Sequence, residues 1–231
     1  MTSLTELKKK LVQAATICEM EGLCGGFGHL SVRIPGSDHI MMTPSGPPGA
    51  ARPSSVVTLN LKGEMIKGGG KPNKELPIHT CIYRAREDVL AIAHTHSHYA
   101  VLLGMSGESF VPVCHEGVLF AQGIPFYPKP WLIDNDERGE SLTRMLGDSH
   151  AVLLKGHGSV AVSICLEAVF QVALNLEKNA RIQCELMSMR KLNPFSPEDI
   201  SLSPKREISF RTKWKAWNHF EELGEKNGLF E

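Results

Sequence analysis

The chain has 231 residues, of which 42% are hydrophobic and 22% are charged, so it carries enough apolar material to bury a core. We therefore expect a single domain spanning residues 1–231. Its 25 basic residues balance 25 acidic ones, which excludes a strong overall field that would attract nucleic acid or an anionic membrane surface. The expected partner is a small molecule or another copy of the chain.

The sequence carries no recognisable targeting or membrane-spanning signal. Its N-terminal stretch lacks the apolar segment of a signal peptide, and no run approaches the roughly 20 apolar residues of a membrane span. Six cysteines are scattered along the chain without a C-x-x-C pair, which suits reduced thiols. These features predict a cytoplasmic protein.

The first third of the chain predicts one helix followed by short strands. Residues 4–21 place apolar side chains at steps of three and four, with Thr2 or Ser3 as a helix cap, and the helix should stop at Gly22. Segments rich in β-forming residues follow, separated by Pro/Gly-rich loops. These predicted strands are residues 30–34, 39–43 and 56–61.

The rest of the chain alternates predicted helices and buried strands. A helix over 74–86 precedes a buried strand at 89–96, and Asp134 can cap a helix that runs to about Gly147. Three further elements follow: a buried strand at 151–155, a turn at 156–159 into the apolar stretch VAVSI, and a long helix over 166–189. A shorter amphipathic helix is expected around Trp214, Trp217 and Phe220.

Two histidines end the predicted strand at 89–96. His94 and His96 lie two residues apart, and because side chains alternate along a strand, both imidazoles should project from one face. His157 lies between two glycines after another buried strand, where the backbone can approach an ion closely. Three neutral imidazoles predict a divalent metal, with zinc first and manganese, iron or cobalt as alternatives. Chance spacing, with His98 merely extending the alternation, is the competing interpretation.

Glu75 stands at the start of the predicted helix over 74–86. The unpaired N–H groups and the dipole of a helix start stabilise a negative charge there, so an ordinary helix-start role explains this residue. The functional interpretation is a carboxylate beside the metal that occupies a coordination position at rest or moves protons during turnover.

Five motifs in this order resemble one known family: GHLSVR (28–33), TPSG (43–46), KELPIH (74–79), AHTHS (93–97) and GHGS (156–159). The resemblance is to the class II aldolase/adducin family, typified by fuculose-phosphate and ribulose-phosphate enzymes, and covers roughly residues 5–190. It implies an α/β fold with three α/β/α layers around a mainly antiparallel sheet. It also implies a homotetramer with active sites between neighbouring subunits.

The resemblance assigns roles to individual positions. It implies His94, His96 and His157 as the metal ligands and Glu75 as the catalytic carboxylate. The other motif positions that become candidates to contact substrate are Ser31, Thr43 and Ser45.

Departures from the phosphosugar members of this family narrow the expected substrate. Those members usually have Asn after the glycine of the first motif and a pair of small hydroxyl residues before the glutamate, which together cradle a phosphate. Here these positions hold His29 and the pair Asn73 and Lys74. The first motif is closer to branches that include decarboxylases of carboxylated dihydroxy-aromatics or of their ring-cleavage products. His29 and Lys74 would suit a carboxylate through charge-assisted hydrogen bonds, while a hydrogen-bonded loop histidine and a solvated lysine remain the alternatives.

The general acid also departs from the family pattern. Aldolases of this family tend to supply a tyrosine from the adjacent subunit, whereas the corresponding stretch here, residues 111–120, offers His115 and Glu116. A histidine titrates near neutrality and could protonate a carbanion, although His115 also suits a plain loop position. Tyr127, in a Pro-rich segment, is a weaker candidate.

The leading hypothesis is therefore a metal-dependent carbon–carbon lyase, with decarboxylation of a dihydroxyphthalate-like compound or a ring-cleavage product as its reaction. A divalent cation lowers the barrier to such cleavage by stabilising the enolate charge. Three alternatives stay open: an aldolase acting on a sugar phosphate or hydroxy-keto acid, a non-catalytic adducin-like module, and an iron-dependent oxygenase.

Overall fold

A computed structural model describes residues 3–203 and 210–230, without the side chains of residues 210–214. Its centre is one eight-stranded sheet in the order β4-β3-β2-β1-β5-β8-β7-β6. Neighbouring strands are antiparallel except for the parallel pair β6 and β7. The strands are β1 His29–Arg33, β2 His39–Met42, β3 Val57–Asn60, β4 Met65–Gly68, β5 Ala91–Thr95, β6 Phe126–Tyr127, β7 Ala151–Leu154 and β8 Gly158–Ser163.

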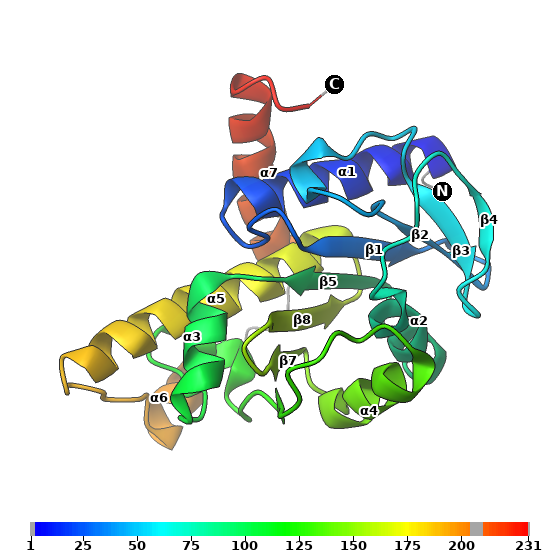
Figure 1. Cartoon of the computed structure of the whole chain (residues 1–231). Helices are drawn as coiled ribbons and strands as arrows, with labels where there is room; N and C mark the ends of the chain where they lie inside the picture. The colour runs from blue at the N-terminus through cyan, green and yellow to red at the C-terminus, as the bar shows by residue number, and fades with distance from the viewer. Residues whose placement is uncertain (1–2, 204–209, 231) are drawn as a thin grey trace.

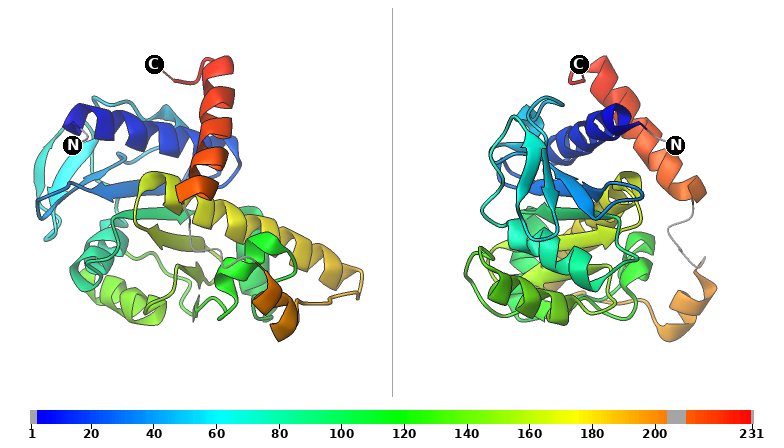
Figure 2. Two further views of the ribbon diagram at one scale, coloured as in Figure 1. Left: turned by 180° about the vertical axis from the view of Figure 1, so that it is seen from behind. Right: turned by 90° about the vertical axis from the view of Figure 1, so that its right-hand side faces the viewer.

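Helices cover both faces of the sheet (Figures 1 and 2). One face carries α1 Leu4–Met20, α3 His98–Ser106 and α5 Leu166–Ser188, with α7 Phe210–Lys226 against α1 and α5. The opposite face carries α2 Leu76–Ala85 and α4 Asp136–Leu146. The shorter pieces are the 3-10 turns η1 Pro48–Ala50 and η2 His115–Phe120 and the helix α6 Pro197–Leu202. This confirms the expected three-layer α/β/α arrangement.

The alternation of side chains along β5 divides the core in two. Ala91 and Ala93 pack into the cluster beneath α1 and α5, whereas Ile92 packs with α2 and α4. His94 follows Ile92 by two residues and therefore projects toward the α2 side. The imidazole of His94, at the carboxyl end of β5, therefore lies near the start of α2.

Most expected elements are present. Helix α1 is present where the apolar stripe predicted it, and Ser3, one of the two expected caps, forms a capping box with Glu6. At the other end of the chain, Trp217 is buried and Phe220 packs against the core, while the side chain of Trp214 lies outside the described residues. Helices α3 and α6 and strands β4 and β6 are additions to the sequence-based assignment. Among the described helices, none combines the length and apolarity needed to cross a membrane.

Candidate metal centre

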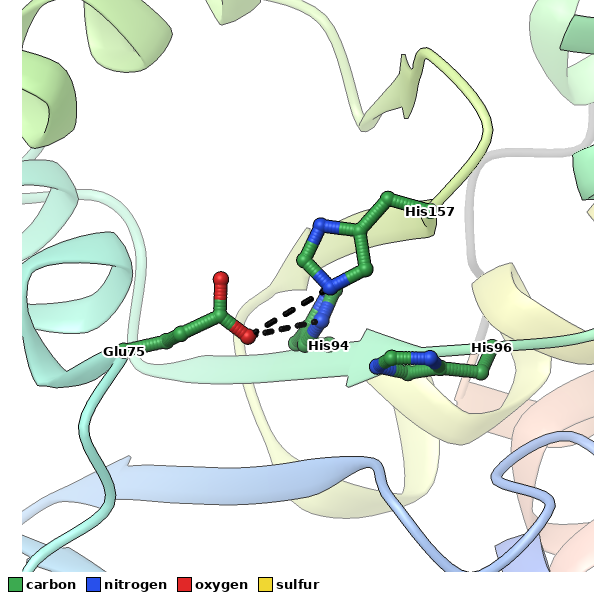
Figure 3. Close-up of side chains that lie close together, drawn as sticks. All are labelled: Glu75, His94, His96 and His157. Atoms are coloured by element: carbon green, nitrogen blue, oxygen red, sulfur yellow. Dashed lines mark ion pairs between the residues drawn. The ribbon is translucent and has the colours of Figure 1, made fainter. Parts of the chain in front are cut away.

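Four side chains from three separate parts of the fold converge at the carboxyl end of β5 (Figure 3). Glu75, His94, His96 and His157 each offer one ligand atom, and these atoms lie within 4.8 Å of one another. We call this group the ligand cluster. Its donors are nitrogen and oxygen atoms of the kind that bind first-row divalent metals.

The local chain explains how these residues meet. His94 ends β5 and His96 follows directly, while Glu75 caps α2 and His157 lies in the turn between β7 and β8. Gly158 brings that turn against β5, because a Cβ at this position would lie only 2.0 Å from the carbonyl oxygen of Thr95. The small residue therefore sets the distance between His157 and the histidines of β5.

His94 is oriented by its other ring nitrogen. Its Nδ1 lies 3.0 Å from the carbonyl oxygen of Ser159, which can only accept a hydrogen bond, so Nδ1 carries the hydrogen. The lone pair is then on Nε2, which points at the Oε2 atom of Glu75 from 3.5 Å. This Nε2 is buried and has no hydrogen-bond partner among the described residues.

Glu75 is held in place from the opposite side. The backbone N–H of Ile133 donates to its Oε1 at 2.9 Å, and the backbone N–H of Glu75 itself donates to Asn73 Oδ1 at 3.1 Å. Its Oε2 is left facing His94 and His157, each at 3.5 Å. A carboxylate oxygen opposite a nitrogen lone pair is repulsive in isolation, so this arrangement fits a cation between them.

The protonation states agree with a ligand role. Burial, the largest influence, lowers the pKa of His94 to about 4 and that of His96 to about 3, so both rings are neutral near pH 7. The backbone N–H of Ile133 donates to the Glu75 carboxylate, and such a hydrogen bond favours the ionised form of the carboxyl group. Neutral imidazoles and an ionised carboxylate are the forms that bind a metal.

A cavity of about 610 Å³ opens beside the ligand cluster. Its polar wall contains Ser45, Asn73 and Lys74, three of the residues that the sequence indicated as substrate contacts. Its apolar wall includes Phe27 and Leu132, which sequence reasoning missed. The cavity is large enough for a small organic molecule with both a charged group and an apolar face.

Phe27 stands out because it is 73% exposed beside a polar site. The ring centroid of Phe27 lies 5.9 Å from that of His96. Its loop contains Gly25 and Gly26 at positive φ, and the backbone N–H of Gly26 donates to a carboxylate oxygen of Glu19 at 3.2 Å. A single aromatic residue within a glycine run was the signal available in the sequence.

The other predicted substrate contacts lie elsewhere. Thr43 is buried and its hydroxyl accepts the backbone N–H of Leu30 at 3.1 Å, so it joins β1 to the end of β2. Tyr127 is also buried, with its hydroxyl 3.3 Å from the indole nitrogen of Trp131. Neither residue lines the cavity, in contrast to the sequence-based expectation.

His29 and Ser31 lie beneath α2 rather than in the cavity lining. His29 is almost fully buried next to the ligand cluster, with its Nε2 3.9 Å from Glu75 Oε2. Ser31 is fully buried and hydrogen-bonded to His79 and Tyr83. Both side chains therefore face the protein interior.

His115 is exposed in η2, and its ring packs against Phe195 with centroids 5.9 Å apart. It is absent from the lining of the cavity within the same chain. His115 is therefore not brought to the ligand cluster by the fold of the single chain.

Comparison with known proteins shows which family has this architecture. The family model described as "Class II Aldolase and Adducin N-terminal domain" matches residues 9–184. The chain belongs to the class II aldolase and adducin family. Members of this family use a divalent metal and act on small molecules, and the chain is a metal-dependent lyase of this group.

Three relatives illustrate the range of this family. The chain is 28% identical over 228 residues to a 3,4-dihydroxyphthalate decarboxylase from Arthrobacter keyseri, covering 92% of this chain and 91% of the relative. It is 33% identical over 138 residues to a 5-deoxy-D-ribulose 1-phosphate aldolase from Bacillus thuringiensis, covering 60% and 64% respectively. An aldolase II superfamily protein from Pseudomonas syringae has the same fold, with a TM-score of 0.89, 22% identity, and coverage of 98% of this chain and 94% of that one.

Proposed function

We propose that this class II aldolase-family protein is a metal-dependent decarboxylase of a carboxylated dihydroxy-aromatic compound, of the dihydroxyphthalate type, or of a ring-cleavage product. The observation that carries the proposal is the combination of polar and apolar residues that line the cavity beside the ligand cluster. Lys74 and Asn73 supply hydrogen-bonding groups, and Phe27 and Leu132 add apolar surface. A planar ring with a carboxylate presents the matching surfaces.

The relatives support the same reaction class. The decarboxylase from Arthrobacter keyseri matches nearly the whole chain, whereas the match to the ribulose-phosphate aldolase spans 60% of it. The position before Glu75 also favours a carboxylate over a phosphate, because Lys74 and Asn73 replace the small hydroxyl pair typical of phosphosugar members.

The metal is proposed to be zinc, held by His94, His96 and His157 with Glu75 as a fourth donor at rest. Three imidazoles and one carboxylate suit zinc, and manganese, iron and cobalt accept the same donors. Lewis-acid stabilisation of the developing enolate charge is the chemistry that a divalent ion supplies when bound there.

The residues of the chain have separate tasks in this proposal. Lys74 donates to the substrate carboxylate, and Phe27 and Leu132 shield the ring from water. Glu75 changes from ligand to proton carrier, because its Oε1 stays fixed by the N–H of Ile133 while Oε2 is free to turn to the substrate.

We extend the proposal to a homotetramer in which His115 of one copy reaches the cavity of its neighbour. His115 is exposed and lies outside the cavity lining of its own chain, as a residue shared between copies requires. No disulfide forms among the described cysteines, which suits the reducing cytoplasm as the place of action.

The deciding experiment compares two products. The metal-loaded protein is incubated with a panel of dihydroxyphthalates and ring-cleavage acids, with release of carbon dioxide as the readout, and separately with ketose phosphates, with aldehyde release as the readout. Carbon dioxide from an aromatic acid supports the proposal. Aldehyde release alone would instead establish the aldolase alternative, which the match to the ribulose-phosphate aldolase favours.

The remaining alternatives have their own readouts. An iron-dependent oxygenase would consume dioxygen during turnover, which an oxygen electrode detects. A non-catalytic adducin-like module has no need of the ligand cluster, so absence of bound metal from the purified protein would favour it.

A further inference from the structure

A fourth histidine lies as close to His94 as the ligands are to one another. His29 pairs with His94 across β1 and β5, and their ring centroids are 4.9 Å apart. The corresponding distance between His94 and His157 is also 4.9 Å. Proximity by itself therefore does not explain why His29 stands outside the ligand cluster.

The difference lies behind His29, in a row of buried polar groups beneath α2. His29 Nδ1 is 2.7 Å from His79 Nε2, and His79 Nδ1 is 2.6 Å from the hydroxyl oxygen of Ser31. That oxygen is 2.9 Å from the hydroxyl oxygen of Tyr83. All four side chains are at most 1% exposed, and we call them the interior chain.

The hydrogens of the interior chain can run in only two directions. His29 and His79 are at most 1% exposed, and burial favours the neutral form of an imidazole, so each ring carries one hydrogen. In the first direction, Tyr83 donates to Ser31, Ser31 donates to His79, and His79 donates through Nε2 to Nδ1 of His29. In the second direction, His29 donates to His79 and His79 donates to Ser31, whose oxygen can also accept the hydrogen of Tyr83.

Counting hydrogens separates the two directions. The reversed direction leaves one buried hydroxyl hydrogen, of Ser31 or of Tyr83, without an acceptor, because the described residues offer these two hydroxyls no other acceptor. It also turns a lone pair of His29 Nε2 toward the carboxylate of Glu75. The first direction pairs both hydroxyl hydrogens and the ring hydrogen of His79, and it points the N–H of His29 toward the carboxylate instead.

We infer that Tyr83, Ser31 and His79 form a one-way hydrogen-bond chain that fixes His29 with its hydrogen on Nε2. His29 is then a neutral donor aimed at the Oε2 side of Glu75, and it cannot serve as a fourth imidazole ligand. His79, Ser31 and Tyr83 are positioning residues that act through His29.

The donor has a task in the site. The Nε2 atom of His29 is buried, has no hydrogen-bond partner among the described residues, and lies 3.9 Å from Glu75 Oε2. A small rotation of the carboxylate toward His29 closes that distance to a hydrogen bond. His29 thus offers Glu75 an alternative partner when the carboxylate leaves the cation, a consequence that rests on the proposed metal site.

The tautomer can be measured directly in the full chain. Histidine labelled with ¹⁵N in the ring is incorporated, and long-range ¹H–¹⁵N correlation spectra are recorded at pH 7.5 with zinc bound and after chelation. His29→Gln and His79→Gln variants assign the two signals. Both rings should carry hydrogen on Nε2. Hydrogen on Nδ1 of His29 would overturn the inference, whatever the protein's catalytic activity.

Two hydroxyl deletions test what sets the direction. Ser31→Ala removes the donor to His79, so a second set of His29 ring signals with hydrogen on Nδ1 should appear. Tyr83→Phe is the matched control, because Ser31 still donates to His79 and the single Nε2–H tautomer should persist. A single unchanged tautomer in Ser31→Ala would show that the serine does not set the direction.

Metal binding supplies a second readout that is independent of turnover. His29→Gln should keep one equivalent of zinc, with an affinity lowered by no more than about tenfold to a hundredfold in a chelator competition, as for a residue that supports the ligands without joining them. His94→Gln should lose that equivalent. Loss of zinc from both variants would make His29 a ligand and contradict the inference.

Discussion

His94 in the ligand cluster and His29 in the interior chain face each other on neighbouring strands, at the same depth of the sheet and with similar burial. The Nδ1 atom of His94 faces a hydrogen-bond acceptor, whereas the Nδ1 atom of His29 faces a donor. His94 Nδ1 faces a backbone carbonyl, which fixes a lone pair on Nε2, whereas His29 Nδ1 faces the ring nitrogen at the end of a row of donors. The role of an imidazole in this protein therefore follows from the partner behind it.

The start of α2 and its next turn differ in the same way. Glu75, at the cap of α2, turns its carboxylate to the cavity, while His79, one helical turn later, is sealed against β1. This short helix thus contributes to the proposed chemistry through its N-cap residue, Glu75, and supports that chemistry through His79 in the following turn.

Breaking the ligand cluster should have the largest effect. His94→Ala or His157→Ala removes a ligand, and turnover should fall by roughly a thousandfold or more, since Lewis-acid stabilisation is worth several kcal/mol. Metal analysis should show loss of the bound ion. His98→Ala is the matched control, because His98 is exposed at the start of α3 and outside the cluster, and it should keep both metal and turnover. Normal activity in either ligand variant would end the assignment.

Neutralising the carboxylate tests Glu75 as a proton carrier. Glu75→Gln keeps the shape of the side chain, so the metal should still bind, more weakly, while kcat falls by about 10²- to 10⁴-fold. Glu167→Gln is the control: this buried carboxylate pairs with Lys10 at 2.9 Å far from the cavity, so its removal should leave kcat unchanged. A Glu75→Gln variant with ordinary kcat would reduce this residue to a helix-start role.

The charged wall of the cavity should matter less than the cluster. Lys74→Met removes one charge-assisted hydrogen bond to the substrate, so kcat/KM should fall about tenfold to a hundredfold, mainly through KM. Lys67→Met, on the exposed strand β4, is the matched control and should not change KM. An unchanged KM in Lys74→Met would remove this lysine from the substrate site.

Removing the Tyr83 hydroxyl, at the end of the interior chain farthest from the ligand cluster, should have the smallest effect on turnover. Tyr83→Phe removes one buried hydroxyl that donates only to Ser31, so the free energy of unfolding should drop by about 1 kcal/mol. Urea denaturation measures this loss, and turnover should stay within about threefold. A large fall in turnover with unchanged stability would give Tyr83 a more direct role than positioning.

The sequence by itself determined the elements that carry the site. Apolar periodicity predicted α1, β5, α2 and α5, and the spacing of His94 and His96 predicted a shared direction for their rings, because such patterns depend on the geometry of a single element. The family resemblance then brought Glu75 and His157 into the same site before any contact was known.

Some elements and contacts depended on neighbours that are distant in sequence. Helix α3 is apolar on nearly all sides, with Leu102 and Met105 exposed, so no amphipathic pattern marked it. Strand β6 has two residues and follows Pro125, and its order comes from pairing with β7. In both cases the local sequence carries too little periodic signal to define the element.

Tertiary structure by itself decided which polar residues face the cavity. Ser31 and Thr43 belong to motifs that suggest substrate contact, yet their hydroxyls are satisfied within the protein by His79 and by the backbone of Leu30. Phe27, which no motif marked, lies in the cavity wall. Periodicity tells on which side of its own strand or helix a residue lies, but the hydrogen-bond partner it finds there is set by the packing of elements far apart in the chain.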